Sequence, residues 1–352
     1  MRVGDNPTPI SGDHTTICKF PTPGPRYDLV KLAVNELVAE VTSTIVNISR
    51  SLGPTEMENP KPTNIREVAQ LQNLAFEISS QGDYMQAVSL MRQALQGFKG
   101  ILGEEHIHTL HAQSNLGGML ADAGSPDEGV VLQRQALQRF EETLGKKHYD
   151  TLLTVRALSH GLWRQGRYQD SEIASRRALE GLTEILGEEN PDVLRAQHDL
   201  GVALASQGKF QEAVVVYQQV IKRREKVLGV EHRDTLNEYD CLACVLNATG
   251  DYQGAEEQAR RAYEGGQRTL GRDHSATLCW SIHLVKALFS QTKYEEAEAL
   301  LLHLLEVRER TLGGTHPDTL NTLNLLAKVV TFQGRHGDAN LWRQRLSRAS
   351  WI

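Results

Sequence analysis

Residues 102–110 read Leu-Gly-Glu-Glu-His-Ile-His-Thr-Leu, and variants of this segment recur along most of the chain. The later copies begin at Leu144, Leu186, Leu228, Leu270 and Leu312. The spacing is 42 residues each time, without an insertion. A fixed period of this size is typical of a stacked repeat array, in which each unit packs mainly on its neighbours. The sequence therefore predicts one extended solenoid.

Each 42-residue unit contains a second periodic mark, a glycine-containing turn. It reads Gly82-Asp-Tyr, Gly166-Arg-Tyr, Gly208-Lys-Phe and Gly250-Asp-Tyr, whereas the sixth unit has Thr292-Lys-Tyr and no glycine. Glycine ends a helix at little cost because it tolerates positive φ. The position that follows a recurring leucine before this turn is mostly small: Ala75, Gly117, Ser159, Gly201, Ala243, Val285 and Ala327. Small residues let two helices approach closely, so we expect helix pairs and an all-α fold.

The composition is that of a folded protein, with 23% charged and 40% hydrophobic residues among 352. A net charge of −6 argues against a general nucleic-acid binder. Four cysteines (Cys18, Cys241, Cys244 and Cys279) are too few for an extracellular disulfide framework. No apolar run approaches the ~20 residues that a membrane span needs, and the polar start, Met1 to Asp13, is unlike a signal peptide. We expect a cytoplasmic protein with no nucleic-acid or membrane partner and no cofactor.

The turns and the connector that reads Leu312-Gly-Gly-Thr-His-Pro-Asp-Thr-Leu together resemble the tetratricopeptide repeat (TPR), in its 42-residue, kinesin-light-chain-like form. The resemblance covers about residues 63–349 as seven helix pairs. It implies a right-handed superhelical solenoid in which the first helix of each pair lines a concave, peptide-holding groove. The connector histidines recur at a turn, so we interpret them as structural: His106, His148, His232, His274 and His316.

The segment before the repeats divides into two parts. Residues 1–25 are rich in Pro, Gly and Thr and are expected to be irregular. Residues 26–62 combine a helix from Tyr27 to Leu52, with apolar residues three or four apart, and a proline-containing linker. We expect this helix to cap the array; the alternative is a detachable segment that blocks the groove or grips a partner.

The stretch from Gly12 to Phe20 is similar to the end of the α/β-hydrolase-like domain in fungal multidomain NTPase–repeat proteins. In that family His14 would correspond to the catalytic base. No Gly-x-Ser-x-Gly motif precedes it, so a nucleophile is missing and we interpret His14 as a relic. A regulatory fragment descended from a larger immune-type receptor is therefore one possible origin of the chain.

Positions that face the groove in the TPR family can be assigned here by adding 42. The position that is commonly Asn in kinesin-light-chain-like arrays is Asn73 and Asn115, followed by Ala157, Asp199, Cys241, His283 and Leu325. Asparagine is therefore present in the first two repeats only. This argues against a site that binds any extended peptide through its backbone, and it favours a more specific ligand. The residues that we expect to bind it are Arg156, His160, Trp163, Arg195, His198, Asp199, Asn237, Asp240, His283, Lys286, Asn324 and Lys328.

Charge and size suggest what the groove accepts. Its inferred cations, Arg156, Arg164, Arg195, Lys286 and Lys328, outnumber its carboxylates, Asp122, Asp199 and Asp240, which favours an anionic ligand. The residues beside the third inner helix are small, namely Gly118, Ala121, Val202 and Ala205. Open space beside Trp163 and His160 would make a pocket with a few polar groups. Alternatively, curvature closes the gap and Trp163 is a wall.

Two functions follow from these residues. The first is an interaction module that binds a peptide or protein segment of acidic character in the concave groove. The second is a small-molecule pocket for an anionic ligand, acting as a cofactor-free isomerase or cyclase. There His160 or His198 would be acid or base, and Arg156 would stabilise an oxyanion. The sequence favours the first, because structural or anchoring roles are commoner for such residues.

A zinc site is the remaining possibility for the cysteines. Cys241 and Cys244 share one helix face, as do Cys279 and His283 on the next inner helix, and four such ligands could hold tetrahedral zinc. Cysteine is more often a small buried residue, and helices about 9 Å apart make convergence demanding. We therefore expect no metal.

Overall fold

The computed structural model describes residues 64–349, which form fourteen helices and no strand. The predicted irregular segment at 1–25 and the predicted capping helix and linker at 26–62 lie outside these residues. The helices are α2 (Ile65–Ser80), α3 (Tyr84–Leu102), α4 (Ile107–Asp122), α5 (Pro126–Leu144), α6 (Tyr149–Arg164), α7 (Tyr168–Leu186), α8 (Pro191–Ser206), α9 (Phe210–Leu228), α10 (Arg233–Thr249), α11 (Tyr252–Thr269), α12 (Ser275–Ser290), α13 (Tyr294–Leu312), α14 (Pro317–Phe332) and α15 (His336–Ala349).

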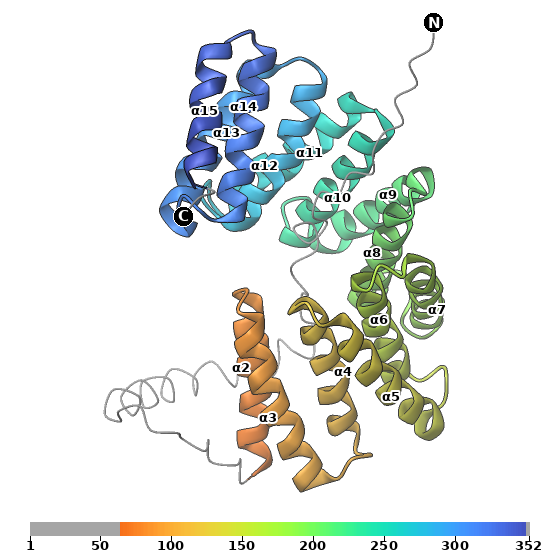
Figure 1. Cartoon of the computed structure of the whole chain (residues 1–352). Helices are drawn as coiled ribbons and strands as arrows, with labels where there is room; N and C mark the ends of the chain where they lie inside the picture. Colours follow the sequence, from red (N-terminus) through yellow and green to blue (C-terminus); the bar gives the residue numbers. More distant parts are fainter. Residues whose placement is uncertain (1–63, 350–352) are drawn as a thin grey trace, which may run out of the picture.

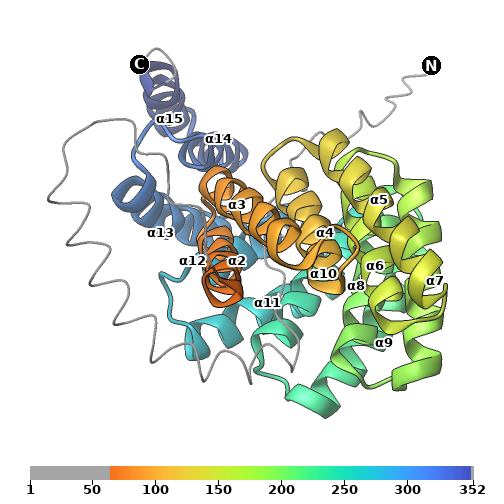
Figure 2. The same cartoon turned by 90° about the horizontal axis from the view of Figure 1, so that it is seen from below.

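Consecutive helices pack as seven pairs, which confirms the predicted all-α solenoid. The array bends like the letter C (Figure 1). The even-numbered helices α4, α6, α8 and α10 lie on its inner side, and the odd-numbered helices α5, α7 and α9 cover the outer side; the view from below shows the same order (Figure 2). Four hydrophobic clusters follow one another along the array in place of one central core. Each cluster joins neighbouring helices only, as expected for a solenoid.

The junctions between helices repeat at half the sequence period. Twelve glycines with φ between 76° and 97° stand 21 or 42 residues apart, from Gly82 to Gly334. A left-handed residue closes the last turn of a helix, and glycine adopts it without steric penalty. Thr292 occupies the vacant place in this series and takes φ 60°, the one non-glycine residue with positive φ in the described part of the chain.

The recurring connector has a local physical explanation. In its first copy, Gly103 ends α3 with φ 89°. The Nδ1 atom of His106 then accepts the backbone N–H of His108 at 3.2 Å and caps α4. The hydroxyl of Thr109 donates to the carbonyl of Gly103 at 2.7 Å and closes the turn. Asn190 replaces the histidine in the fourth pair and accepts the N–H of Asp192 at 2.9 Å. The connector histidines are therefore caps, which confirms the structural interpretation.

Small residues permit a close contact between the backbones of α4 and α5. A Cβ atom on Gly117 would lie 2.6 Å from the carbonyl oxygen of Gly129, and one on Gly129 would lie 2.3 Å from that of Gly117. Real Cβ atoms do not approach a backbone oxygen so closely, so both positions require glycine. The neighbouring Gly118 faces more open space, because a Cβ there would meet only the side chain of Gln133 at 3.9 Å.

Candidate functional site

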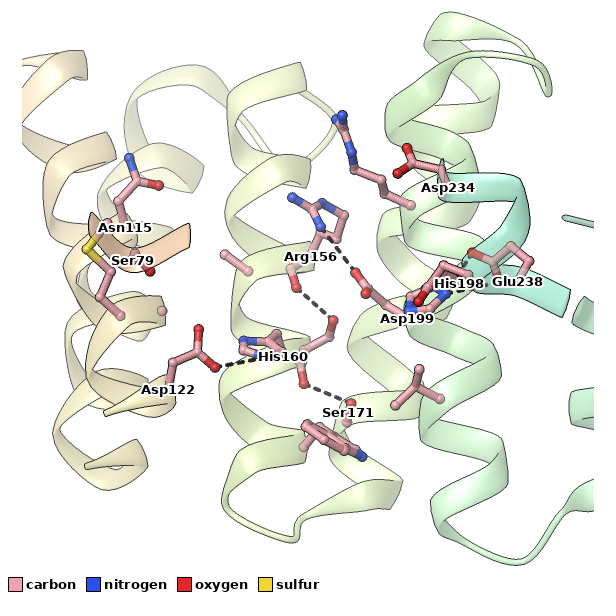
Figure 3. Close-up of a pocket in the computed structure, with 18 of the residues that line it drawn as sticks. Ser79, Asn115, Asp122, Arg156, His160, Ser171, His198, Asp199, Asp234 and Glu238 are labelled. Atoms are coloured by element: carbon pink, nitrogen blue, oxygen red, sulfur yellow. Dashed lines mark hydrogen bonds and ion pairs between the residues drawn. The ribbon is translucent and has the colours of Figure 1, made fainter. Parts of the chain in front are cut away.

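A pocket of about 240 Å³ lies in the hollow of the concave face. Its wall comes from the inner helices α2 to α12, with single residues from α5, α7 and α9. Figure 3 shows Asn115 and Asp122 on one side, Arg156 and His160 in the middle, and a third group around His198 on the other side. Eight predicted ligand-binding residues line it: Arg156, His160, Trp163, Arg195, His198, Asp199, Asn237 and Asp240.

Several pairs of side chains on neighbouring inner helices meet at a sequence separation of 43. Arg156 of α6 lies 3.3 Å from Asp199 of α8. The indole N–H of Trp163 donates to the hydroxyl of Ser206 at 2.7 Å. His283 of α12 lies 2.8 Å from Asp240 of α10. A step of 42 identifies equivalent positions in successive repeats, but side chains that meet need not be equivalent: Arg164 meets Asp122 at a separation of 42, and His160 meets it at 38.

Two guanidinium groups stand next to each other in the pocket. Burial lowers the pKa of Arg195, and the positive charge of nearby Arg156 lowers it further, while Asp192 and Asp234 oppose the shift. Arg195 pairs with Asp192 at 2.7 Å, and Asp192 also accepts the Tyr149 hydroxyl at 2.7 Å. Two like charges in a partly desolvated site repel each other. A ligand carboxylate between them would relieve this repulsion.

His160 and Trp163 form the middle of the wall. Their rings stack with centroids 6.0 Å apart, and His160 Nε2 lies 3.6 Å from the Asp122 carboxylate. Trp163 is only 9% exposed, and its indole N–H is taken by Ser206. Trp163 is thus fixed in the wall and also lines the pocket. A pocket beside Trp163 and a wall formed by Trp163 are alternatives from the sequence alone, and here the residue has both positions.

A buried acid–base cluster borders the other end of the pocket. Glu238 is fully buried and accepts a hydrogen bond from His198 at 2.8 Å, and Arg224 lies 3.4 Å away. Burial alone would raise the pKa of Glu238, but the charges of His198 and Arg224 lower it. The carboxylate therefore stays ionised and holds the His198 ring in place.

Sequence reasoning missed Glu238 and Arg224. In preceding repeats the corresponding positions are apolar or small: Arg224 replaces Phe98, Phe140 and Leu182, and Glu238 replaces Ala112, Thr154 and Ala196. A charge at a core position of a repeat was the signal that could have identified them. With them the lining holds four arginines and five carboxylates, so the pocket lacks the excess of cations that the inferred groove set indicated.

Four predicted site residues do not line this pocket. His283 is buried against Asp240, while Lys286 on α12 and the α14 residues Asn324 and Lys328 are exposed. The array continues past the pocket at this end, with α13, α14 and α15 following α12.

The possible zinc set of Cys241, Cys244, Cys279 and His283 is not brought together. Within residues 64–349, the group of three or more possible ligand atoms that lie within 4.8 Å of one another is His198, Glu238 and Cys241. The Arg224 guanidinium beside Glu238 already balances its charge and would repel a metal cation. The four residues considered for zinc therefore do not form one cluster, and His283 is hydrogen bonded to Asp240.

None of the described helices is both long and apolar enough to cross a membrane. None of the curated proteins compared with the chain matches it. Among solved structures, TPR-like repeats of a kinesin-light-chain-type protein from Podosopora anserina are 26% identical. They align with 59% of this chain and 98% of that chain at a TM-score of 0.53.

Two more distant structures share the fold. A signal transduction ATPase with a TPR sensor from Pyrococcus horikoshii is 13% identical, with 92% of this chain and 47% of that chain aligned and a TM-score of 0.61. A Rap protein complexed with competence and sporulation factor is also 13% identical, with 83% and 79% aligned and a TM-score of 0.55.

Family models of the tetratricopeptide repeat match most of the array. One matches residues 109–181, 156–226 and 276–346, and a second matches residues 68–108 and 235–276. These ranges fall on the helix pairs described above and together include every inner helix of the pocket. The chain belongs to the tetratricopeptide repeat family.

Proposed function

We propose that the concave pocket binds an extended peptide or protein segment, and that Arg156 and Arg195 hold an acidic group of that segment. The observation that carries the proposal is the pair of adjacent guanidiniums in a pocket lined by six inner helices. The fold supports the class of partner, because a structurally similar Rap protein is complexed with competence and sporulation factor. The acidic part of the ligand is argued from this chain alone.

The chemistry favours a carboxylate at this subsite. Arg156 pairs with one carboxylate, Asp199, at 3.3 Å, and its buried Nε has no hydrogen-bond partner among the described residues. Guanidinium groups bind carboxylates through two parallel hydrogen bonds. An Asp or Glu side chain, or a terminal carboxylate, would gain such bonds and reduce the repulsion between Arg156 and Arg195. Removing one partner of a buried charge pair at an interface typically costs about 2–5 kcal/mol.

The test measures binding of the chain to two sets of immobilised peptides. The peptides of one set contain Asp and Glu, and those of the other set contain Asn and Gln at the same positions. We expect acidic peptides to bind, and R156Q and R195Q to weaken them at least about tenfold, which corresponds to about 1.4 kcal/mol. Arg134 on the outer helix α5 is exposed, so R134Q is the matched control that removes the same charge elsewhere. Equal binding of acidic and amide peptides, or unchanged binding in R156Q and R195Q, would refute the proposal.

A second candidate is a small-molecule site with acid–base chemistry. It is favoured by the hydrogen bond between His198 and the ionised Glu238, which orients an imidazole in the pocket. Native mass spectrometry of the purified chain distinguishes the two functions. A bound small molecule that is lost in H198Q supports the second candidate, whereas a ligand-free chain that gains an acidic peptide supports the first.

We propose that the protein acts in the cytoplasm. Cys241, Cys244 and Cys279 form no disulfide, as expected under reducing conditions. The net charge of −6 also makes nucleic acid a poor partner. Fractionation of the source cells, followed by detection of the chain, tests the location.

A further inference from the structure

The first helix of the described array exposes an apolar side chain that every later inner helix buries. Leu74 of α2 is 36% exposed, whereas its equivalents are between 0% and 6% exposed: Leu116, Leu158, Leu200, Leu242, Leu284 and Leu326. Leu71, three residues before it, and Ile78, four residues after it, lie on the same side of the helix and are half-buried. We call these three side chains the open face of α2.

The open face results from the position of α2 at one end of the array (Figure 1). Each later inner helix packs on the outer helix before it and on the outer helix after it, as α4 packs on α3 and α5. Leu116 of α4 thus belongs to one hydrophobic cluster with Met91 and Leu95 of the preceding α3. Among the described helices, α2 packs mainly on α3, which follows it. The place before α2 is therefore the one that a covering element would fill.

The opposite end of the described array has a more polar surface. Its last helix is α15, and the exposed side chains of residues 340–347 are polar apart from Leu341, namely Asn340, Arg343, Gln344, Arg345 and Ser347. Terminal units of a solenoid need a polar outer surface to stay soluble. On α2, Gln70 and Glu77 only border the apolar stripe, so this end of the array is the one that we expect to be covered.

The chain contains a segment whose pattern matches the open face. From Tyr27 to Leu52, apolar residues fall three or four apart, as on one side of a helix. Residues 53–63 join this segment to Asn64, which caps the start of α2. Fully extended, residues 53–63 span about 36 Å, whereas the 16 residues of α2 span about 24 Å. The linker therefore allows the segment to lie beside α2 along its whole length.

We propose that residues 27–52 form a helix whose apolar side packs on the open face of α2, as α3 packs on α4. A tethered segment has an advantage over a separate molecule, because a short flexible linker gives it an effective concentration of about millimolar. Phe76 and Ser79 of α2 line the pocket, so a cover that fixes α2 also fixes one wall of the pocket. The proposal does not depend on what the pocket binds.

Hydrogen exchange of the full chain tests this contact from both sides. Mass spectrometry follows peptides from residues 27–52, from α2 and from α14, and we expect residues 27–52 to be protected in the wild-type chain. V41D adds a charge to the apolar side of the segment and should speed exchange in α2 at least about tenfold, the factor expected for loss of one buried apolar side chain. L74D adds a charge to the open face and should speed exchange in residues 27–52 by a similar factor.

Two matched controls add the same charge away from the contact. Ser43 stands two residues from Val41, which is about 200° around a helix, so S43D should leave exchange in α2 unchanged. Ile173 is 67% exposed and lies on α7, in the third helix pair, so I173D should leave exchange in residues 27–52 unchanged. Unchanged exchange in α14 shows that the rest of the array stays folded in all four variants.

Three results would overturn the proposal. The first is wild-type exchange in residues 27–52 at the rate of an unstructured peptide, which is decisive without any variant. The second is unchanged exchange in α2 of V41D. The third is exchange in α2 that slows as the protein concentration rises, together with a dimer in sedimentation, because a second copy of the chain would then cover the open face.

Discussion

Thr292 is the residue whose replacement should stabilise the fold most directly. It takes φ 60° at a position where the other junctions of the described array carry a glycine. Left-handed backbone costs an L-residue about 1–2 kcal/mol, and a β-branched side chain is a poor occupant of this region. The Thr292 side chain is exposed, so little packing is lost on its removal.

The expected size of the T292G effect is the difference between two terms. Glycine removes a backbone strain of about 1–2 kcal/mol from the folded state. It also increases the conformational entropy of the unfolded chain, which lowers the stability by about 0.4–1 kcal/mol. At the midpoints of these two ranges the net stabilisation is about 0.8 kcal/mol. G208T is the matched reverse change, because Gly208 has φ 77° and a Cβ there would meet nothing within 4 Å. It should destabilise the chain by a similar amount through the backbone alone.

Urea unfolding followed by far-UV circular dichroism measures both variants. Repeat arrays can unfold in parts, so hydrogen exchange of α12 to α15 should be measured as well, and T292G should slow exchange there first. Unchanged or lower stability in T292G, or a neutral G208T, would show that the left-handed junction carries no significant strain.

Three further predictions test the packing, the caps and the buried histidine. G117A should cost about 1–3 kcal/mol, because its methyl group would lie 2.6 Å from the Gly129 carbonyl, whereas G118A in the same helix should be neutral or stabilising; thermal unfolding compares them. H232A should lose about 1 kcal/mol with its cap, and H232N should keep most of it, since an asparagine caps α8; an H232N as unstable as H232A in urea would contradict this. The raised pKa of His283 stabilises the fold fully below about pH 6.5, and this contribution is lost as the pH rises through about 10, so its NMR signal should still be that of an imidazolium at about pH 8.

The local architecture could be predicted from the repeat because its causes are local. A glycine with positive φ, a histidine or asparagine that caps the next helix, and a threonine that closes the turn act within nine residues, as in Gly103 to Thr109. Their period therefore determined the helix pairs and their junctions. The resemblance to the tetratricopeptide repeat indicated which helix positions face the groove, and the exact period transferred them to each repeat; eight of the predicted residues line one pocket.

The partners across that face could not be predicted in this way. They depend on how far one inner helix is shifted along the next, which is decided by the packing of whole repeats. The resulting offset of 43 brings Arg156 to Asp199 and His283 to Asp240.

The repeat period by itself established that this chain is a solenoid of helix pairs, and it indicated which side chains face inward. Only the tertiary structure decided that Arg224 and Glu238 border the pocket, that its charges are mixed, and that His283 pairs with Asp240. The reason is physical. Backbone junctions and helix faces depend on residues close in sequence, whereas contacts between repeats depend on the packing of whole helices.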